Sequence, residues 1–213
     1  QRGGIPTNGQ PFELILLLGS LLPFIALGTL FHRALLDGSV WTTWTAALST
    51  GIATGQGIIV AHELGHRKPK SARWWLARVL LFCVHYTHFT TEHNHNHHKW
   101  VATVRDPASA YEEEGLWSFW FRTIPGQFLS SVRVHNGKGR TGIRNPSYQG
   151  LIFQIAAIGI MLMLPNGRTM VVGWLVLSTI AILTLEYVNY IRHWGLRRGE
   201  EERKTAMQSW NTE

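Results

Sequence analysis

Charge and cysteine are both scarce in this sequence. Asp, Glu, Lys and Arg make up 15% of the 213 residues, against about 25% in an ordinary soluble domain. Cys83 is the only cysteine, which excludes an intrachain disulfide and gives no indication of secretion. Hydrophobic residues account for 45%, and histidine occurs 11 times. The sequence therefore combines apolar segments with an unusual supply of imidazole.

Four apolar segments contain no charged residue. They cover 14–31, 39–61, 149–164 and 169–185. A membrane-spanning helix needs roughly 20 residues, and each segment has about that length or slightly less. Buried core helices of a soluble protein are the alternative. We predict one all-α domain, 1–213, built as a membrane-embedded helix bundle with four transmembrane helices at about 13–32, 39–61, 148–165 and 169–191.

Short links and the placement of basic residues predict the topology. His32–Gly38 joins the first two segments and Pro165–Arg168 joins the last two, so the four helices form two antiparallel hairpins. Of the 20 Lys and Arg residues, all but three lie in 66–147 and 192–204. A net charge of +7 confined to alternate loops is the positive-inside pattern of a membrane protein, which argues against nucleic acid. Both basic stretches are expected in the cytoplasm.

The cytoplasmic segment is expected to be helical and rich in histidine. Apolar residues at helical spacing predict a helix over 71–98 that leads into the histidines. The aromatic stretch 115–132 predicts a helix in the membrane interface, and 133–147 has the turn residues of a loop. Within the first span, Pro23 is expected to kink the helix.

The first of three chemical motifs is His62-Glu63-Leu64-Gly65-His66. Two imidazoles four residues apart share one face of a helix, so both can reach one metal ion. The motif begins where the second span ends. It is also the zinc-protease pattern, in which Glu63 would be the general base.

The second motif is Glu92-His93-Asn94-His95-Asn96-His97-His98. His93 and His97 are again four residues apart, and the adjacent His98 suits a second metal ion or a bridged pair. His95 points to the opposite face of such a helix and is expected to face either solvent or the lipid headgroups.

Two histidines precede this cluster. His88 lies five residues before His93 and could donate a hydrogen bond that orients a ligand. For both His85 and His88, the alternative to a role at the metal site is a structural one, as a polar side chain on a helix with its hydrogen bonds made.

The third motif, EYVNYIRHWG at 186–195, closes the fourth span. Glu186, then Asn189 or Tyr190, and then His193 follow a three-to-four spacing and share one face. A carboxylate inside a membrane span is costly, which makes Glu186 a functional candidate.

All three motifs are expected at the same end of the bundle. Nitrogen ligands without a thiolate suit iron, zinc or copper, and five or six histidines exceed what one tetrahedral zinc uses. This number of histidines matches two metal ions. We therefore hypothesise that the site carries out dioxygen chemistry next to the lipid.

These motifs resemble the membrane-bound alkane 1-monooxygenase family. The matching residues are HELGHRKP at 62–69, HFTTEHNHNHHKWVATVRDPASA at 88–110 and EYVNYIRHWGLRR at 186–198. The resemblance implies two non-haem iron ions that activate dioxygen and insert one oxygen atom at the terminal carbon of a medium or long n-alkane, giving a 1-alkanol. It also implies electrons from rubredoxin and its flavoprotein reductase, with NAD(P)H acting only indirectly. The implied location is the bacterial inner membrane, with the metal site facing the cytoplasm.

The resemblance also assigns residues to the centre. The iron ligands would be His62, His66, His93, His97, His98 and His193. The residues around the ligands would be Glu63, His88, Glu92, Glu186 and Asn189. The basic segment 66–147 would dock an acidic electron carrier.

The sequence departs from the family pattern in three ways. Arg192 stands where family members usually have Glu before the histidine of the third motif. A last histidine box and an earlier pair of spans are also missing from residues 1–213. We therefore expect further ligands beyond Glu213, and an incomplete, inactive centre in this chain alone.

Four other functions remain open. A xylene-type hydroxylase or a fatty-acid desaturase of the same superfamily would use the same metal chemistry on another substrate. An intramembrane zinc protease would use His62, Glu63 and His66 but leaves the other histidines unexplained. A metal transporter should place its ligands at mid-membrane, whereas these cluster at one end.

Overall fold

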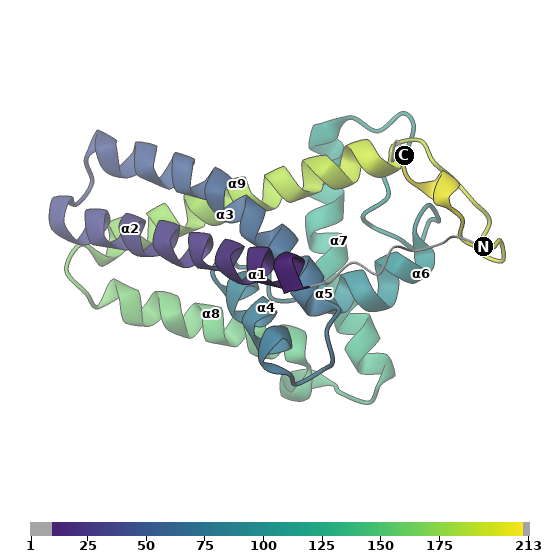
Figure 1. The fold of residues 1–213 in the computed structure, drawn as a ribbon, viewed down its shortest axis with the longest axis horizontal. Coiled ribbons are helices and arrows are strands. Elements are labelled where there is room, and N and C mark those ends of the chain that lie inside the picture. The colour runs from purple at the N-terminus through teal and green to yellow at the C-terminus, as the bar shows by residue number, and fades with distance from the viewer. Residues whose placement is uncertain (1–9, 211–213) are drawn as a thin grey trace.

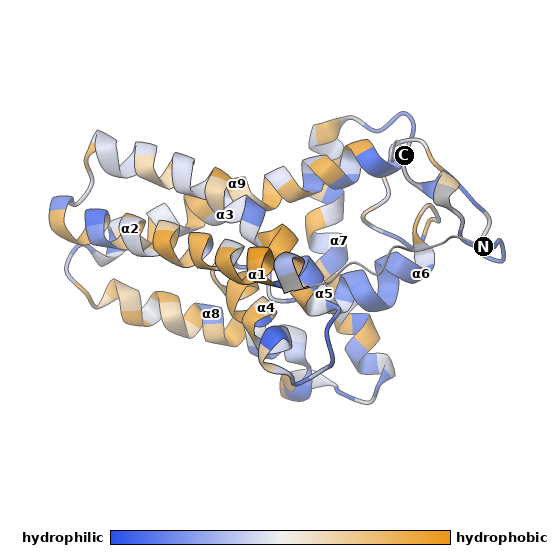
Figure 2. Ribbon diagram, in the orientation of Figure 1, coloured by the Kyte–Doolittle hydropathy of each residue, from blue (hydrophilic) through white to orange (hydrophobic). Residues whose placement is uncertain are grey.

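The protein is described here by a computed structural model in which residues 10–210 are defined. This part of the chain contains helices and no strand, which confirms the all-α prediction. The elongated bundle in Figure 1 contains α1 (Gln10–Gly19), α2 (Leu21–Asp37), α3 (Trp41–Gly65), α8 (Pro146–Leu162) and α9 (Gly167–His193). The remaining helices and the longer loops gather toward the other end of the molecule, where Figure 2 shows more hydrophilic ribbon.

Two stretches among the described residues are long and apolar enough to cross a membrane. They are Pro11–Asp37, which covers most of α1 and all of α2, and Gly167–His193, which is α9. Helix α8 is apolar but shorter, and α3 is not among the candidates. Length and composition thus support two of the four predicted spans, and the four-span count and the orientation remain predictions.

Pro23 accounts for the interruption between α1 and α2. Only Ser20 separates the two helices. Proline cannot donate a hydrogen bond to the carbonyl four residues earlier, here Gly19, and its ring crowds that carbonyl. The Ser20 hydroxyl donates to the Leu17 carbonyl at 2.6 Å, which satisfies one acceptor near the break. The break between the two helices therefore lies within one turn of Pro23, the residue at which a kink was predicted.

Helix α3 packs closely against α9, and Gly51 makes this approach possible. A Cβ atom at Gly51 would lie 2.9 Å from Ile180 Cβ and 3.0 Å from the Leu177 carbonyl oxygen. The latter is a backbone atom of α9, which cannot move like a flexible side chain. This contact sets the separation of the two helices that carry the first and third motifs.

The helix expected over 71–98 is interrupted, and that prediction was wrong. Helix α4 (Ala72–Phe82) ends in a left-handed residue, His85, with φ of 55°. The Tyr86 amide donates to the Leu81 carbonyl, which is the hydrogen bond of a Schellman ending. Trp174 of α9 donates to the Cys83 carbonyl at 2.7 Å, so the turn is tied to the bundle. Tertiary contacts outside this segment therefore end the helix.

The predicted loop 133–147 begins later than expected. Helix α7 runs from Leu116 to Gly137, with Pro125 inside it, so 133–137 are helical. His135 in this last turn is buried, and its Nε2 pairs with the Thr91 hydroxyl at 3.2 Å. Burial of this turn extends the helix beyond its apolar pattern. A 3-10 turn, Gly142–Arg144, then leads into α8.

Replacement of Gly51 by alanine should separate α3 from α9. We expect Gly51→Ala to lower the free energy of unfolding by about 1–3 kcal/mol, because the new methyl group meets a backbone carbonyl. Gly159→Ala in α8 is the matched control, since nothing lies within 4 Å of a Cβ at that position. Thermal unfolding of both variants in detergent, followed by circular dichroism, tests this. Equal midpoints for the two variants would contradict the proposed close contact.

Candidate metal centre

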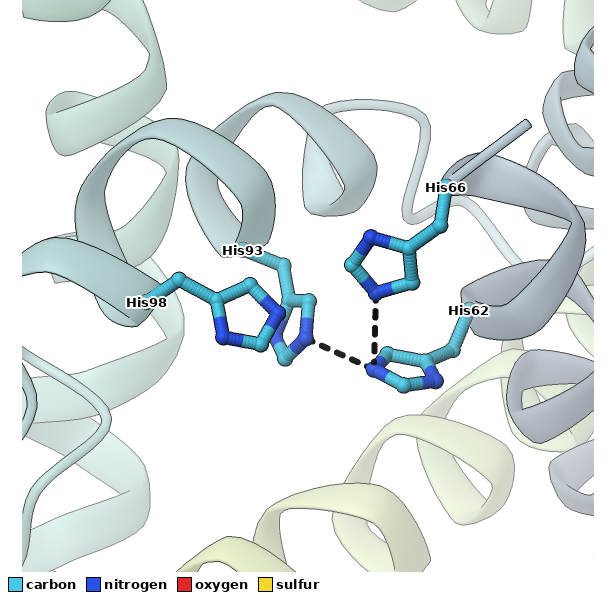
Figure 3. Close-up of side chains that lie close together, drawn as sticks. All are labelled: His62, His66, His93 and His98. Atoms are coloured by element: carbon cyan, nitrogen blue, oxygen red, sulfur yellow. Dashed lines mark hydrogen bonds between the residues drawn. The ribbon is translucent and has the colours of Figure 1, made fainter. Parts of the chain in front are cut away.

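Four histidines form a tight cluster at the end of α3. His62 lies in α3 and His66 is the C-cap residue that follows this helix, whereas His93 and His98 come from the segment after the 83–88 turn. One ring nitrogen of each lies within 4.8 Å of the others. The Nε2 atoms of His62 and His93 are 2.7 Å apart, and those of His62 and His66 are 3.4 Å apart. Figure 3 shows the four imidazoles directed toward a common centre.

A π-helical turn arranges the second motif. Helix α5 (Phe89–Glu92) continues into η1 (His93–His97) and then α6 (His98–Trp100). Hydrogen bonds in a π-helix join residues five apart, and such turns are frequent at functional sites. The rings of His93 and His98, five residues apart, have centroids 4.3 Å apart. His93 therefore joins the cluster with His98, instead of with His97 as α-helical spacing predicts.

His97 faces the third motif. Its ring centroid lies 5.0 Å from that of His193, the last residue of α9. It also stacks on His93, with centroids 5.0 Å apart. The six predicted ligands are thus brought to one place, four in the tight cluster and two beside it.

Three of these imidazoles are oriented in the same way. Nδ1 of His62 pairs with the Glu63 carboxylate at 3.0 Å, and Nδ1 of His97 pairs with Asp106 at 2.9 Å. Nδ1 of His193 pairs with the Gln208 carbonyl oxygen, also at 2.9 Å. Each acceptor favours the tautomer with its proton on Nδ1, in which Nε2 carries the lone pair. This is the usual arrangement of histidines that bind a metal through Nε2.

The spacing of the cluster fits a metal ion. With metal–nitrogen bonds of about 2.1 Å, neighbouring ligand atoms lie about 3.0 Å apart and opposite ones about 4.2 Å apart. The ring nitrogens of the cluster are 2.7 Å and 3.4 Å apart in the two hydrogen-bonded pairs and at most 4.8 Å apart overall, which brackets that range. Small side-chain rotations would bring all four nitrogens to one ion.

Burial keeps two of the cluster histidines, His93 and His98, in the neutral form that binds cations. Burial and the neighbouring histidines hold the pKa of His93 far below its usual range and lower the pKa of His98 to about 4. Both imidazoles are therefore neutral at pH 7 and present lone pairs. His97 differs: burial acts to lower its pKa, but Asp106 outweighs burial and raises it.

Three buried carboxylates surround the histidines. Glu186 accepts hydrogen bonds from Tyr86 at 3.0 Å and from Asn189 at 3.1 Å. Glu92 accepts from Asn96 at 3.0 Å, and burial, with the nearby Asp106, raises the pKa of Glu92 to about 8. Glu92, Asp106 and Glu186 are each at most 1% exposed. Such groups require nearby positive charge or several hydrogen bonds to be stable in the interior.

Other predicted residues lie away from the cluster. His95 is exposed, as predicted. His85 pairs with the Ser178 hydroxyl at 2.8 Å and packs on Trp174. His88 is buried between Tyr86 and Phe128 and lines a different cavity, without a hydrogen bond to any of the six candidate ligands in the described chain. His85 thus has the structural role that was predicted as the alternative to a role at the metal site.

A cavity of about 400 Å³ lies beside the histidines. Its wall includes Arg192, so the residue that departs from the family pattern lies at the candidate site. Residues from 204–209 close another side, and Lys204 donates to the His98 carbonyl at 3.1 Å. The segment after α9 therefore folds back over the candidate centre.

Sequence reasoning assigned no role to Asp106. Its carboxylate accepts from His97, from the Ser109 hydroxyl at 2.6 Å and from the Ala108 amide at 3.1 Å. The only signal was the DPAS tetrapeptide within the resemblance at 88–110. Nothing in the spacing indicates that a residue nine positions after His97 returns to it.

Comparison with known proteins yields one family match. The model of the family described as fatty acid desaturase matches residues 39–213. This range includes all three histidine motifs.

Several individual relatives are named as hydrocarbon monooxygenases. The alkane 1-monooxygenase of Ectopseudomonas oleovorans is 33% identical over 202 residues, covering 85% of this chain and 50% of that protein. An alkane 1-monooxygenase of Alcanivorax borkumensis is 34% identical over 184 residues, covering 78% and 43%. The xylene/toluene monooxygenase hydroxylase component of Pseudomonas putida is 25% identical over 162 residues, covering 71% and 42%. The chain thus spans about half the length of these relatives.

Loss of one cluster histidine should abolish tight metal binding. We expect His93→Ala to weaken binding of iron(II) by a hundredfold or more, as about 3 kcal/mol is lost with one of four ligands. His95→Ala is the matched control, because His95 lies in the same π-helical turn but outside the cluster. Metal content after dialysis against iron(II), measured by mass spectrometry, separates them. Equal retention of iron in both variants would remove His93 from the ligand set.

Asp106 should act through the orientation of His97. We expect Asp106→Asn to reduce metal affinity about 10- to 100-fold, since the acceptor that fixes the imidazole is altered. Ser109→Ala removes another hydrogen bond to the same carboxylate and should have a smaller effect. Titration with cobalt(II), followed by its visible absorption, measures both affinities. Wild-type affinity in Asp106→Asn would show that His97 needs no such partner.

Proposed function

Because the chain belongs to the fatty acid desaturase family, we propose that it forms part of a membrane di-iron monooxygenase that hydroxylates n-alkanes at the terminal carbon. The product would be a 1-alkanol of medium or long chain. The observation that carries this proposal is the convergence of six histidines from three distant segments. The relatives named alkane 1-monooxygenase supply the substrate class.

We assign the histidines to two iron positions. His62, His66, His93 and His98 would hold one ion, because their ring nitrogens lie within 4.8 Å of one another. His97 and His193 would contribute to the second ion beside it. Two bound iron ions would supply the redox chemistry that activates dioxygen and inserts one of its atoms into a C–H bond.

The protein's own residues would orient the ligands and balance charge. Glu63 and Asp106 hold the rings of His62 and His97 through Nδ1. Bound metal ions would favour the ionised form of Glu92, whose pKa burial raises to about 8 without them, and the buried Glu92 and Glu186 would then offset part of the positive charge. Arg192 at the cavity wall would add positive charge where the family usually has a carboxylate. The site is therefore expected to bind metal less tightly than one with Glu at that position.

Electrons and substrate would reach the centre from different sides. The basic segment 66–147 would dock rubredoxin, itself reduced by a flavoprotein reductase at the expense of NAD(P)H. The n-alkane would enter from the lipid beside the bundle. The protein would then lie in the bacterial inner membrane with the histidines facing the cytoplasm, an orientation that the positive-inside pattern supports.

Two alternatives are less well supported. A xylene-type hydroxylase has a relative at 25% identity, below the alkane monooxygenases at 33% and 34%. A zinc protease requires Glu63 to activate water, whereas its carboxylate pairs with His62 Nδ1 at 3.0 Å. It also leaves His93 and His98 without a function beside His62.

A chimera that carries part of this chain within a relative tests the proposal. Residues 39–213 would replace the aligned part of the Ectopseudomonas oleovorans alkane 1-monooxygenase. We expect the chimera, with rubredoxin, its reductase, NADH and ¹⁸O₂, to convert n-octane or n-dodecane to labelled 1-alkanol, because the exchanged segment supplies equivalent ligands. Gas chromatography with mass spectrometry detects the product.

The control is the same chimera with His93→Ala, which should produce no alkanol. A chimera that oxidises m-xylene but no alkane would favour the function of a xylene-type hydroxylase. One zinc per chain and no iron in the purified protein would favour the protease.

A further inference from the structure

A second cavity lies on the other side of the 83–88 turn. It encloses about 740 Å³ between α4, the end of α7 and α8, and it shares no lining residue with the cavity beside the histidines. A volume of this size is typical of sites for small molecules. The cavity is therefore large enough for a ligand of its own.

One end of this cavity is positively charged. Arg78 from α4 and Arg140 from the loop after α7 line it, and its lining contains no Asp or Glu. The Arg78 guanidinium stacks on Trp74, with 3.2 Å between Cζ and the ring centroid, and makes no ion pair with a carboxylate within the described residues. An anionic group would complement this end.

Buried polar atoms at the same end lack partners. Nε2 of His88, Nδ1 of His135 and Nη1 of Arg78 are buried without a hydrogen bond. Both histidine side chains line the cavity and are only 7% exposed. A buried donor without an acceptor is unfavourable, so these atoms favour a ligand with several acceptor oxygens.

The two histidines would act as neutral donors. Burial lowers the pKa of His88 to about 3, and burial together with nearby cations, Lys138 first, lowers the pKa of His135 to about 4. Both rings are therefore uncharged at pH 7. The positive charge at this end of the cavity comes from the two arginines.

The other end of the cavity is apolar and open. Phe82 of α4 and Phe153, Ala157 and Ile160 of α8 line it. Phe153 and Ile160 are 66% and 65% exposed, so this wall continues onto the outer surface of α8. An alkyl chain could lie along α8 while the rest of the molecule stays outside.

We propose that this cavity binds an anionic phospholipid of the surrounding bilayer. The phosphate would lie between Arg78 and Arg140, with hydrogen bonds from His88 and His135, and one acyl chain would lie along α8. Basic pockets beside membrane helices are suited to anionic headgroups. Trp74 and Trp75 fit the headgroup level, where tryptophan is favoured. The inference rests on the membrane placement in the proposed function.

A phospholipid fits better than a fatty acid. Two arginines and two imidazoles offer more donors than one carboxylate uses, whereas a phosphodiester and its glycerol ester groups present several acceptors. The open apolar wall also leaves room for a second acyl chain in the bilayer. A neutral lipid would leave the two guanidinium charges without a counter-ion.

Native mass spectrometry of the whole chain, released from nanodiscs of phosphatidylcholine and phosphatidylglycerol, tests the proposal. We expect one retained phosphatidylglycerol, and retention about 25-fold weaker in Arg78→Gln/Arg140→Gln, as each arginine contributes roughly a factor of five. Arg133→Gln/Arg144→Gln is the matched control, because these exposed arginines do not line the cavity. The control should retain the lipid within about twofold of wild type.

A second variant leaves the charge unchanged. Ala157→Trp should fill the apolar end and displace the lipid as well. Equal losses in both arginine pairs would overturn the proposal in favour of general surface attraction. Wild-type retention in Ala157→Trp, or a retained fatty acid in place of the phospholipid, would also overturn it. Iron content in the same samples separates this outcome from the proposed function, which stands if iron binds without the lipid.

Discussion

The orientation of imidazole by a hydrogen bond at Nδ1 is the constraint on which the site depends. A neutral imidazole can present its lone pair at either nitrogen, and an acceptor at Nδ1 selects Nε2. Glu63, Asp106 and the Gln208 carbonyl perform this selection for three of the six candidate ligands. These acceptors come from three parts of the chain. The fold therefore has to bring both the histidines and their acceptors together before a metal can bind.

The scaffold meets this requirement through close helix contacts at one end of the bundle. Gly51 lets α3 approach α9, so the first and third motifs reach the same level. Near the site, a Cβ at Gly65 would lie 2.6 Å from Thr90 Cγ2, so α5 also packs directly on the end of α3. Few side chains separate these elements. The ring positions are consequently set by backbone geometry rather than by flexible packing.

Much of the helix layout could be predicted from the sequence because the signals are local. Uncharged apolar runs indicated the long helices, Pro23 indicated the break, and the spacing of His62 and His66 indicated a shared face. The features that could not be predicted depend on residues that are far apart in the sequence. The break after α4 requires Trp174 of α9 to hold the Cys83 carbonyl, and the role of Asp106 requires a loop to return to His97. Neither contact leaves a periodic pattern in the sequence.

The π-helical turn at His93–His97 has a consequence for how this motif tolerates change in length. A π-helical turn holds one residue more than an α-helical turn, so its register depends on the number of residues and not only on their identity. Removal of one residue between His93 and His98 would restore α-helical winding and leave the two histidines four residues apart, a spacing that also shares one face of a helix. The same removal from an ordinary α-helix would rotate the following residues by about 100° and carry the later ligand away from the earlier one. This segment can therefore lose one residue and keep its ligand geometry, so an alignment gap here would not by itself argue against a metal site.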